Sequence, residues 1–170
     1  MSASDQRQTN AEHRGTSAEQ QGTSAEQQGT NAEQRRRDAG RFPVEKSEDE
    51  WRRALSPEQF HVLRRHGTEP AGRSPLNDEH RRGVFRCAGC GQPLFESSTK
   101  FDSGTGWPSF FRPIEGAVAT SVDRSYSMER TEVHCSRCGG HLGHVFPDGP
   151  EPTGLRYCTN GAALRFEPAA

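Results

Sequence analysis

The first 40 residues lack the side chains that build a hydrophobic core. Residues 1–40 contain no Leu, Ile, Val, Phe, Trp, Tyr or Cys, and Phe42 is the first large apolar residue after Met1. Over all 170 residues the hydrophobic share is 29%, which is below the share typical of globular domains. The core must therefore come from about residues 41–170, and we predict one domain in that range.

The chain also lacks an excess of charge of either sign and any long apolar run. Its formal net charge is −1, so composition gives no reason to expect nucleic acid or an anionic membrane as a partner. No apolar run approaches the roughly 18 residues of a transmembrane helix, and the N-terminus has no apolar signal-peptide segment. Together with cysteine pairs of metal type, this predicts a cytoplasmic protein, which we take to be a monomer.

A seven-residue repeat runs through the tail, with copies that begin at Ala11, Ala18, Ala25 and Ala32. Period seven is typical of coiled coils, but each copy offers one Ala as its only apolar side chain. Each complete copy also contains a Gly, which costs about 1 kcal/mol inside a helix. Residues 1–40 are therefore predicted to be disordered; a helix that forms on a partner is the alternative.

The first elements after the tail are predicted to be two short helices. Ser47 begins a capping box, and Ser56 is followed by Pro at the first helical position. These signals predict helices over 48–55 and 57–65, followed by a loop over 67–83. Short apolar runs separated by Gly, Pro, Asp and Ser then predict strands at 84–87, 93–97, 117–123, 126–134, 143–147, 154–159 and 163–167. The fold class is mainly antiparallel β with a helical N-terminal flank.

The five cysteines divide into two C-x-x-C pairs and one remaining residue, Cys158. Cys87 with Cys90, and Cys135 with Cys138, have the ligand count and local spacing of a tetrahedral zinc site built from four cysteines. The 44 residues between Cys90 and Cys135 exceed the spacing of a simple zinc ribbon, so the metal would join two distant turns of a β fold. Four thiolates fill the coordination sphere, which predicts structural Zn²⁺; two redox-active pairs are the alternative.

The remaining cysteine lies in a predicted strand beside polar residues. Because strand side chains alternate between faces, Arg156, Cys158 and Asn160 would point one way, and Leu155 and Tyr157 the other. Arg156 could favour the thiolate of Cys158, which is the reactive form. A single Cys is nevertheless more often a small buried hydrophobe, so this strand alone leaves both interpretations open.

Two further segments offer groups that a nucleophilic cysteine could use. Gly143 permits a turn, after which His144 and Phe146 would share a face, and His141 and His144 are candidate acids or orienting groups. Trp107 is flanked by Gly and Pro in a turn-rich loop, and its face could receive a small apolar or sulfur-bearing group. Ordinary polar histidines near the metal turns and a Trp that caps the core are the alternatives.

In their order along the chain, these segments resemble the methionine-R-sulfoxide reductases of the B type, in their zinc-containing branch. The resemblance covers about residues 48–167. It rests on Glu50-Trp51, Leu55-Ser56-Pro57-Glu58, Gly67-Thr68-Glu69, Gly104-x-Gly106-Trp107-Pro108-Ser109-Phe110, Arg130-Thr131-Glu132-Val133, His141-Leu142-Gly143-His144-Val145-Phe146 and Arg156-Tyr157-Cys158-x-Asn160. It implies two antiparallel sheets, in a β-tent or barrel-like arrangement, with flanking helices. It also implies reduction of the R epimer of methionine sulfoxide, free or in proteins.

The resemblance also implies a role for each site residue. The residue matching Cys158 attacks the sulfoxide sulfur and becomes a sulfenic acid as methionine leaves. The other implied roles are proton donation by His144 with support from His141, binding of the S-methyl group by Trp107 and Phe146, and tuning of the thiolate and a bound water by Arg156 and Asn160.

One position departs from a common pattern of this family. Many members carry a resolving cysteine where this chain has Thr105. With four cysteines bound to zinc, a sulfenic acid at Cys158 would find no second thiol in the chain. We therefore expect regeneration by an external thiol such as thioredoxin, glutaredoxin or glutathione. Two other functions are weighed: a zinc-ribbon binding module without catalysis, and a reductase fold that binds sulfoxides or senses redox state.

Overall fold

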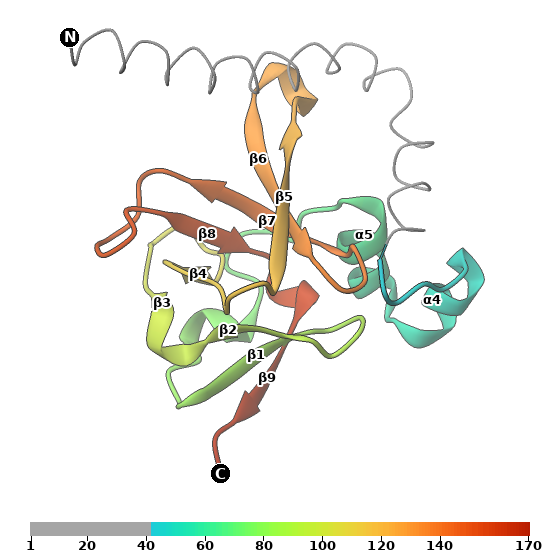
Figure 1. Cartoon of the computed structure of the whole chain (residues 1–170), viewed down its shortest axis with the longest axis horizontal. Helices are drawn as coiled ribbons and strands as arrows, with labels where there is room; N and C mark the ends of the chain where they lie inside the picture. The colour runs from blue at the N-terminus through green and yellow to red at the C-terminus, as the bar shows by residue number, and fades with distance from the viewer. Residues whose placement is uncertain (1–41) are drawn as a thin grey trace, which may run out of the picture. The chain divides into compact units, whose positions relative to one another are not determined.

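The computed structural model describes residues 42–170, and the repeat tail predicted to be disordered lies outside these residues. Helices α4 (Glu48–Ala54) and α5 (Pro57–Arg65) come first and two antiparallel sheets follow (Figure 1). The predicted mainly β fold class is therefore confirmed. Within the described part of the chain, no helix has the length and apolar character needed to cross a membrane.

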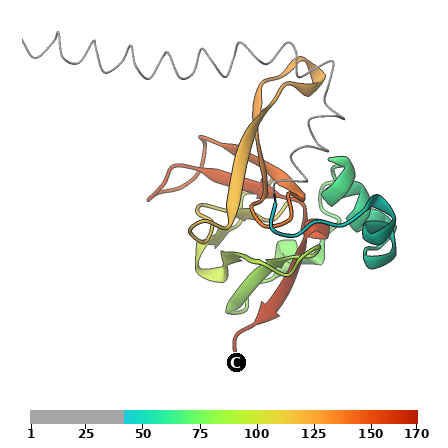
Figure 2. The same ribbon diagram turned by 45° about the vertical axis from the view of Figure 1, so that its right-hand side comes forward.

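The smaller sheet has three strands in the order β2-β1-β9, and the larger has six in the order β3-β4-β8-β7-β6-β5. The strands are β1 Gly83–Cys87, β2 Pro93–Glu96, β3 Lys100–Phe101, β4 Ser109–Phe110, β5 Val118–Asp123, β6 Arg130–Cys135, β7 His141–Phe146, β8 Arg156–Thr159 and β9 Leu164–Pro168. Four short 3-10 helices join them: η1 Pro75–Asp78, η2 Ser97–Thr99, η3 Ser125–Ser127 and η4 Gly161–Ala163. The hairpin of β5 and β6 extends away from the smaller sheet (Figures 1 and 2).

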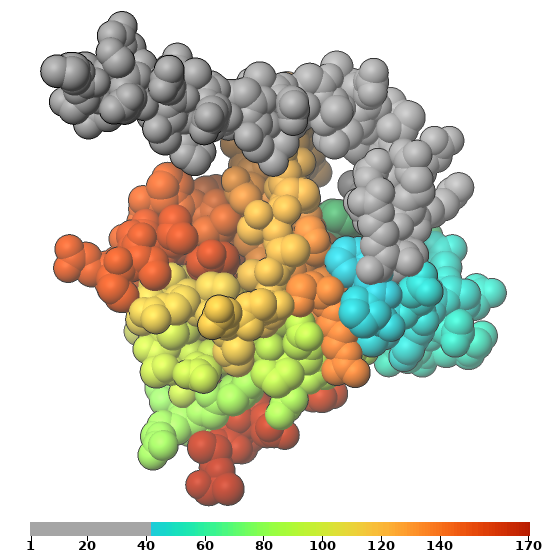
Figure 3. Space-filling model, viewed as in Figure 1, coloured from blue at the N-terminus to red at the C-terminus, as the bar shows by residue number. Residues whose placement is uncertain are grey.

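Both helices begin where the capping signals predict. The Ser47 hydroxyl accepts the N–H of Glu50, and the Glu50 carboxylate accepts the N–H of Ser47. Ser56 and Gln59 form the same reciprocal pair. Helix α5 ends at His66, whose left-handed backbone (φ 56°) turns the chain toward the larger sheet. Helix α5 packs against β7, and α4 packs against α5. In the space-filling view the blue-cyan segment that leads into α4 adjoins the orange segment that contains β7 (Figure 3).

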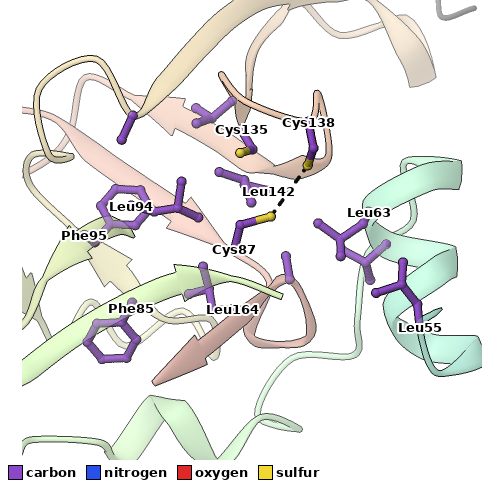
Figure 4. Close-up of a cluster of buried hydrophobic side chains, with 14 of the residues drawn as sticks. Leu55, Leu63, Phe85, Cys87, Leu94, Phe95, Cys135, Cys138, Leu142 and Leu164 are labelled. Carbon is purple, nitrogen blue, oxygen red and sulfur yellow. Dashed lines mark hydrogen bonds between the residues drawn. The ribbon is translucent and has the colours of Figure 1, made fainter. Parts of the chain in front are cut away.

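Aromatic rings from both sheets form the centre of the core. The ring of Phe110 on β4 lies 5.0 Å from that of Phe85 on β1 and 4.3 Å from that of Phe95 on β2, measured between centroids. All three rings are fully buried, and burial of such a side chain is worth about 1.5–3 kcal/mol. Leu94, Leu142 and Leu63 extend this core toward the cysteine sulfurs (Figure 4). The two sheets therefore share one core.

Two features of the sheets differ from the sequence prediction. The sequence pattern predicts neither β3 nor β4, because strands of two residues show no alternation of apolar and polar side chains. Strand β6 begins at Arg130 rather than at 126. The turn helix η3 occupies the intervening residues, and Tyr126 has a left-handed backbone there (φ 57°).

Candidate active site

The two C-x-x-C pairs meet at one point although they lie far apart in the sequence. The Sγ atoms of Cys87 and Cys138 are 3.7 Å apart, and those of Cys90 and Cys135 are 3.6 Å apart. Three of these sulfurs are visible in Figure 4. With Zn–S bonds of about 2.3 Å, a tetrahedral site has sulfur–sulfur edges of about 3.8 Å. The four cysteines form no disulfide, and their positions are compatible with a structural zinc site.

Donor groups surround these sulfurs. The N–H groups of Gly89 and Gly140 donate to the Sγ atoms of Cys87 and Cys138 at 3.3 and 3.4 Å. The guanidinium of Arg64 donates to the carbonyl oxygen of Cys138 at 2.9 Å. Four thiolates around one Zn²⁺ carry excess negative charge, which such N–H donors and a nearby cation stabilise. The surroundings therefore fit a filled site with four thiolate ligands.

Cys158 lies on β8, between β4 and β7 in the larger sheet. Its backbone pairs with Ser109 on β4 and with His144 on β7. Because paired residues project their side chains to the same face, the thiol, the hydroxyl and the imidazole lie together. Two residues earlier on β8, Arg156 pairs with Phe146. The structure thus brings these four predicted site residues to one face, with Ser109 beside them.

The glycine of the His-Leu-Gly-His segment does not form the turn that the sequence suggests. Gly143 lies inside β7 and pairs with Thr159. A Cβ atom added at this position would lie 1.9 Å from the carbonyl oxygen of Cys158. Glycine is required here because β7 and β8 approach each other closely, a constraint that no local sequence pattern reveals. That approach sets His144 beside Cys158.

Hydroxyl groups from the loop before β4 surround the thiol of Cys158. The Oγ1 atom of Thr105 lies 4.0 Å from the Sγ atom, and Ser103 Oγ lies 2.8 Å from the hydroxyl oxygens of both Thr105 and Ser109. Burial raises the pKa of the Cys158 thiol, although Thr105, the charge of Arg156 and Ser109 each oppose this shift. Arg156 thus acts in the predicted direction but is outweighed, and the thiol keeps its proton at neutral pH.

His144 is bonded to a carboxylate that the sequence did not predict. Its Nε2 atom lies 2.7 Å from Oδ2 of Asp123, which reaches it from β5. Burial lowers the pKa of His144, and the bond to Asp123 offsets only part of this effect. The pKa of Asp123 is held at about 2 in spite of its burial, because the Ser125 N–H and His144 stabilise the carboxylate. A neutral imidazole therefore faces an ionised carboxylate at neutral pH. No local pattern marks Asp123, which lies 21 positions from His144.

His141 is buried and has a different carboxylate partner. Its Nδ1 atom lies 2.8 Å from Oε2 of Glu132, while its Nε2 atom is buried and has no hydrogen-bond partner among residues 42–170. Burial alone would raise the pKa of Glu132, but the bonds from His134 and His141 hold it well below its usual range. The rings of His141 and His144 meet edge to face with centroids 5.5 Å apart.

Glu69 connects two predicted site residues that are distant in the sequence. Its carbonyl oxygen accepts the indole N–H of Trp107 at 3.0 Å, and its own N–H donates to Oδ1 of Asn160 at 2.9 Å. Its buried carboxylate accepts the N–H groups of Gly161 and Ala162 at 2.7 and 2.9 Å. Burial raises the pKa of Glu69 even against these two bonds. The sequence pattern places Glu69 only in a loop, because all its partners are far along the chain.

Arg156, two residues before Cys158 on β8, is held by contacts with Asp148 and Phe146. Its Nε and Nη2 atoms donate to the two carboxylate oxygens of Asp148 at 2.9 and 3.1 Å. Its guanidinium carbon lies 4.5 Å from the centroid of the Phe146 ring. Arg156 therefore covers part of Phe146, and the ring can offer a ligand only the surface that this cation leaves open.

A thiol and an imidazole paired with a carboxylate thus lie on one face of the larger sheet, and the loop that carries Trp107 reaches the thiol through Thr105. Comparison with known families decides where this arrangement belongs, because the SelR domain matches residues 55–168. The chain belongs to the SelR domain family. The match includes all four clustered cysteines and every candidate site residue from Trp107 to Asn160.

Three curated relatives of this SelR chain have the name peptide methionine sulfoxide reductase MsrB. The protein from Agrobacterium fabrum is 56% identical over 126 residues, which cover 74% of this chain and 93% of that protein. The protein from Leptospira interrogans is 53% identical over 127 residues, or 74% and 97% of the two chains. That from Bradyrhizobium diazoefficiens is 59% identical over 126 residues, or 74% and 91%. The predicted resemblance to the methionine sulfoxide reductases of the B type is therefore confirmed.

Proposed function

We propose that this SelR chain reduces the R epimer of methionine sulfoxide, in proteins or free, with Cys158 as the nucleophile. The observation that carries the proposal is the surroundings of the thiol. Thr105 lies 4.0 Å from it, and His144, bonded to Asp123, pairs with it across the strands. The names and identities of the SelR relatives support methionine sulfoxide as the substrate class.

The proposed first step transfers one oxygen atom from the substrate to the enzyme. The sulfur of Cys158 attacks the sulfoxide sulfur and forms an S–S bond. The oxygen then moves to the sulfur of Cys158, where a new S–O bond forms as the S–S bond and the S–O bond of the substrate break. Methionine leaves, and Cys158 becomes a sulfenic acid. The proton of the thiol ends on the transferred oxygen, so atoms and charges balance. Neutral His144, held at Nε2 by Asp123, is the group that takes this proton and returns it to the oxygen. His141 supports the ring of His144 by edge contact.

The proposed methyl pocket uses the two aromatic side chains of the site. The Trp107 indole is anchored through its N–H to Glu69, so the flat face of the ring stays in one orientation. Phe146 is backed by the guanidinium of Arg156. An S-methyl group is small, polarizable and apolar, and it packs well against such rings. We propose that Asn160 orients a bound water. The amide oxygen of its side chain accepts the Glu69 N–H, and this bond holds the end of β8 in place.

We further propose one structural Zn²⁺ ion, bound by Cys87, Cys90, Cys135 and Cys138. The sulfur spacing and the N–H donors around the sulfurs support it. Four thiolates leave no open coordination position, so the ion contributes stability to the fold and takes no part in the reaction.

The second step needs a thiol from outside the chain. Cys158 is the single cysteine outside the proposed zinc site, and Thr105 stands 4.0 Å from it without a thiol. Two external thiols would convert the sulfenic acid back to a thiol, with formation of one disulfide and one water. Thioredoxin, glutaredoxin or glutathione are the proposed reductants.

An assay with separated sulfoxide epimers tests the first step. We expect steady turnover of the R epimer but not of the S epimer with a panel of thiol reductants. Because Cys158 forms the covalent intermediate, Cys158→Ser should lower kcat by about 10⁴-fold or more. Thr120→Ser, on the exposed face of β5, serves as a control with unchanged activity. Turnover that survives in Cys158→Ser would refute the catalytic assignment, and epimer binding without turnover would favour a sensor.

Intact mass measurement tests the second step. Zinc-loaded protein is treated with one equivalent of the R sulfoxide without reductant and then with a sulfenic acid trap. We expect one oxygen, or one trap adduct, on each chain. An intramolecular disulfide in zinc-loaded protein would contradict the need for an external thiol.

A further inference from the structure

A second group of metal-type ligands lies apart from the four cysteines. His66, Glu132 and His141 each bring one ligand atom to a cluster in which these atoms lie within 4.8 Å of one another. The cluster joins three elements, because His66 ends α5, Glu132 lies on β6 and His141 begins β7. Two imidazoles and one carboxylate are a donor set that binds Zn²⁺ with a further position open.

Two imidazoles of this cluster approach the same carboxylate oxygen, as ligands of one shared ion would. The Nδ1 atoms of His141 and His66 lie 2.8 and 3.7 Å from the same oxygen, Oε2 of Glu132. Two ligand atoms bonded to an ion at about 2.0–2.1 Å in a tetrahedral site are about 3.3 Å apart, which lies between these two values. The contact of His66 is too long for a hydrogen bond to Glu132, and its 3.7 Å lies nearer to the ligand–ligand distance of one metal site than to a hydrogen-bond length.

The other oxygen of the Glu132 carboxylate is held in place. Ser121 donates its hydroxyl to Oε1 at 2.7 Å, and Nδ1 of His134 lies 3.2 Å from the same atom. These contacts fix the plane of the carboxylate and leave Oε2 directed at the two imidazoles. Outer contacts of this kind orient the carboxylate ligands of metal sites.

The carboxylate of the cluster is buried from solvent, whereas one of its histidines is partly exposed. Glu132 is 5% exposed and His141 is 2% exposed, whereas the side chain of His66 is 29% exposed and gives an ion a route in. The rings of His66 and His141 stack with centroids 4.8 Å apart. One divalent cation between them would compensate the charge of the buried carboxylate.

We propose that His66, Glu132 and His141 form a second metal site, which binds a divalent transition ion of the zinc class. It is separate from the cysteine cluster, in which every donor is sulfur. It adjoins the thiol centre, because the ring of His141 meets that of His144. Binding of this ion does not depend on the proposed reductase activity.

The test is a Co²⁺ titration of the full chain with its cysteine cluster filled by zinc. We expect one equivalent of bound Co²⁺ that shows visible d–d bands without a thiolate charge-transfer band. His66→Gln should abolish these bands, because it removes a ligand at a partly exposed position. His80→Gln, which alters an exposed histidine, should leave them unchanged. Glu132→Gln should also abolish them, with zinc content and circular dichroism as checks on folding.

The outcomes separate the site from simple hydrogen bonding within the cluster. Absence of Co²⁺ bands in the wild-type chain, or equal bands in wild type and His66→Gln, would overturn the proposal. Co²⁺ that replaces zinc in the cysteine cluster would show a thiolate charge-transfer band. This band distinguishes it from Co²⁺ bound by the two histidines and Glu132. Should Glu132→Gln fail to fold, the comparison of His66→Gln with His80→Gln still decides.

Discussion

The thiol of Cys158 is less acidic than the thiol of a typical reactive cysteine. Reactive cysteines commonly have a lowered pKa, but burial raises that of Cys158. A sulfoxide oxygen must gain a proton before it can leave the substrate, and a thiol that keeps its proton until attack supplies one. The opposite shift at His144, whose pKa burial lowers, keeps a neutral base beside that thiol. The two shifts together favour proton transfer during the reaction over a stored thiolate.

The bond between Asp123 and His144 gives a prediction at this scale. Asp123 raises the pKa of His144 through its hydrogen bond and its charge. In Asp123→Asn the pKa of His144 should fall further, so the neutral base should persist to lower pH. The acidic limb of the pH profile of kcat/KM should therefore move to lower pH. Loss of the orienting carboxylate should also reduce kcat/KM by about 10- to 100-fold, within the contribution of acid–base catalysis, about 10²–10⁴.

A matched variant separates this effect from a general loss of charge. Asp49→Asn removes an exposed carboxylate on α4 and should leave both the rate and the pH profile unchanged. An acidic limb at the same pH in Asp123→Asn and wild type would show that His144 does not carry the proton.

At the scale of single elements, the sequence predicted features that depend on neighbouring residues but not contacts between residues far apart in the chain. Helices α4 and α5 follow from capping residues three positions apart, and the cysteine cluster follows from pairs with fixed local spacing. The partners of Glu69 lie 38 to 93 positions away, and Asp123 reaches His144 across β6. Such contacts depend on strand order and register, which a single sequence does not display. Local motifs therefore indicated the candidate site residues, while the carboxylates that contact them could not be predicted from the sequence.

Strand β7 gives a prediction that depends on its register. In Gly143→Ala the new Cβ atom would collide with the carbonyl oxygen of Cys158 at 1.9 Å, and backbone cannot move aside cheaply. Such overpacking costs about 1–3 kcal/mol of stability. Because the collision pushes β8 away from His144, kcat should fall more than the loss of folded protein explains. Urea denaturation and the epimer assay measure the two effects separately.

Gly154→Ala is the control for Gly143→Ala. Gly154 has a left-handed backbone (φ 73°) and no neighbour within 4 Å of an added Cβ. Its substitution should cost about 1–2 kcal/mol through backbone strain alone and leave kcat of the folded enzyme unchanged. Equal loss of kcat in the two variants would mean that the close approach of β7 and β8 has no special role.

For the whole described domain, the cysteine cluster joins the two sheets. Cys87 ends β1 of the smaller sheet, and Cys135 ends β6 of the larger sheet. The aromatic core also lies between the sheets, so the proposed zinc ion and the core would hold the same two sheets together. The strands β7 and β8, which carry candidate site residues, belong to the larger sheet. Along the chain, β1 and β2 of the smaller sheet precede the larger sheet and β9 follows it. Loss of the metal should therefore affect the site through the fold.

Removal of the metal gives a prediction for the whole molecule. Structural zinc in small peptides is worth about 10–16 kcal/mol, and a domain is stable by only about 5–15 kcal/mol, so chelation should unfold residues 42–170. Thiol titration reports this directly, with one reactive thiol in the zinc-loaded chain and all five after chelation. Cys87→Ser should be unstable and lose its zinc, whereas Cys158→Ser should keep both zinc and stability. A chelated chain with native circular dichroism and full activity would contradict the structural role of the four cysteines.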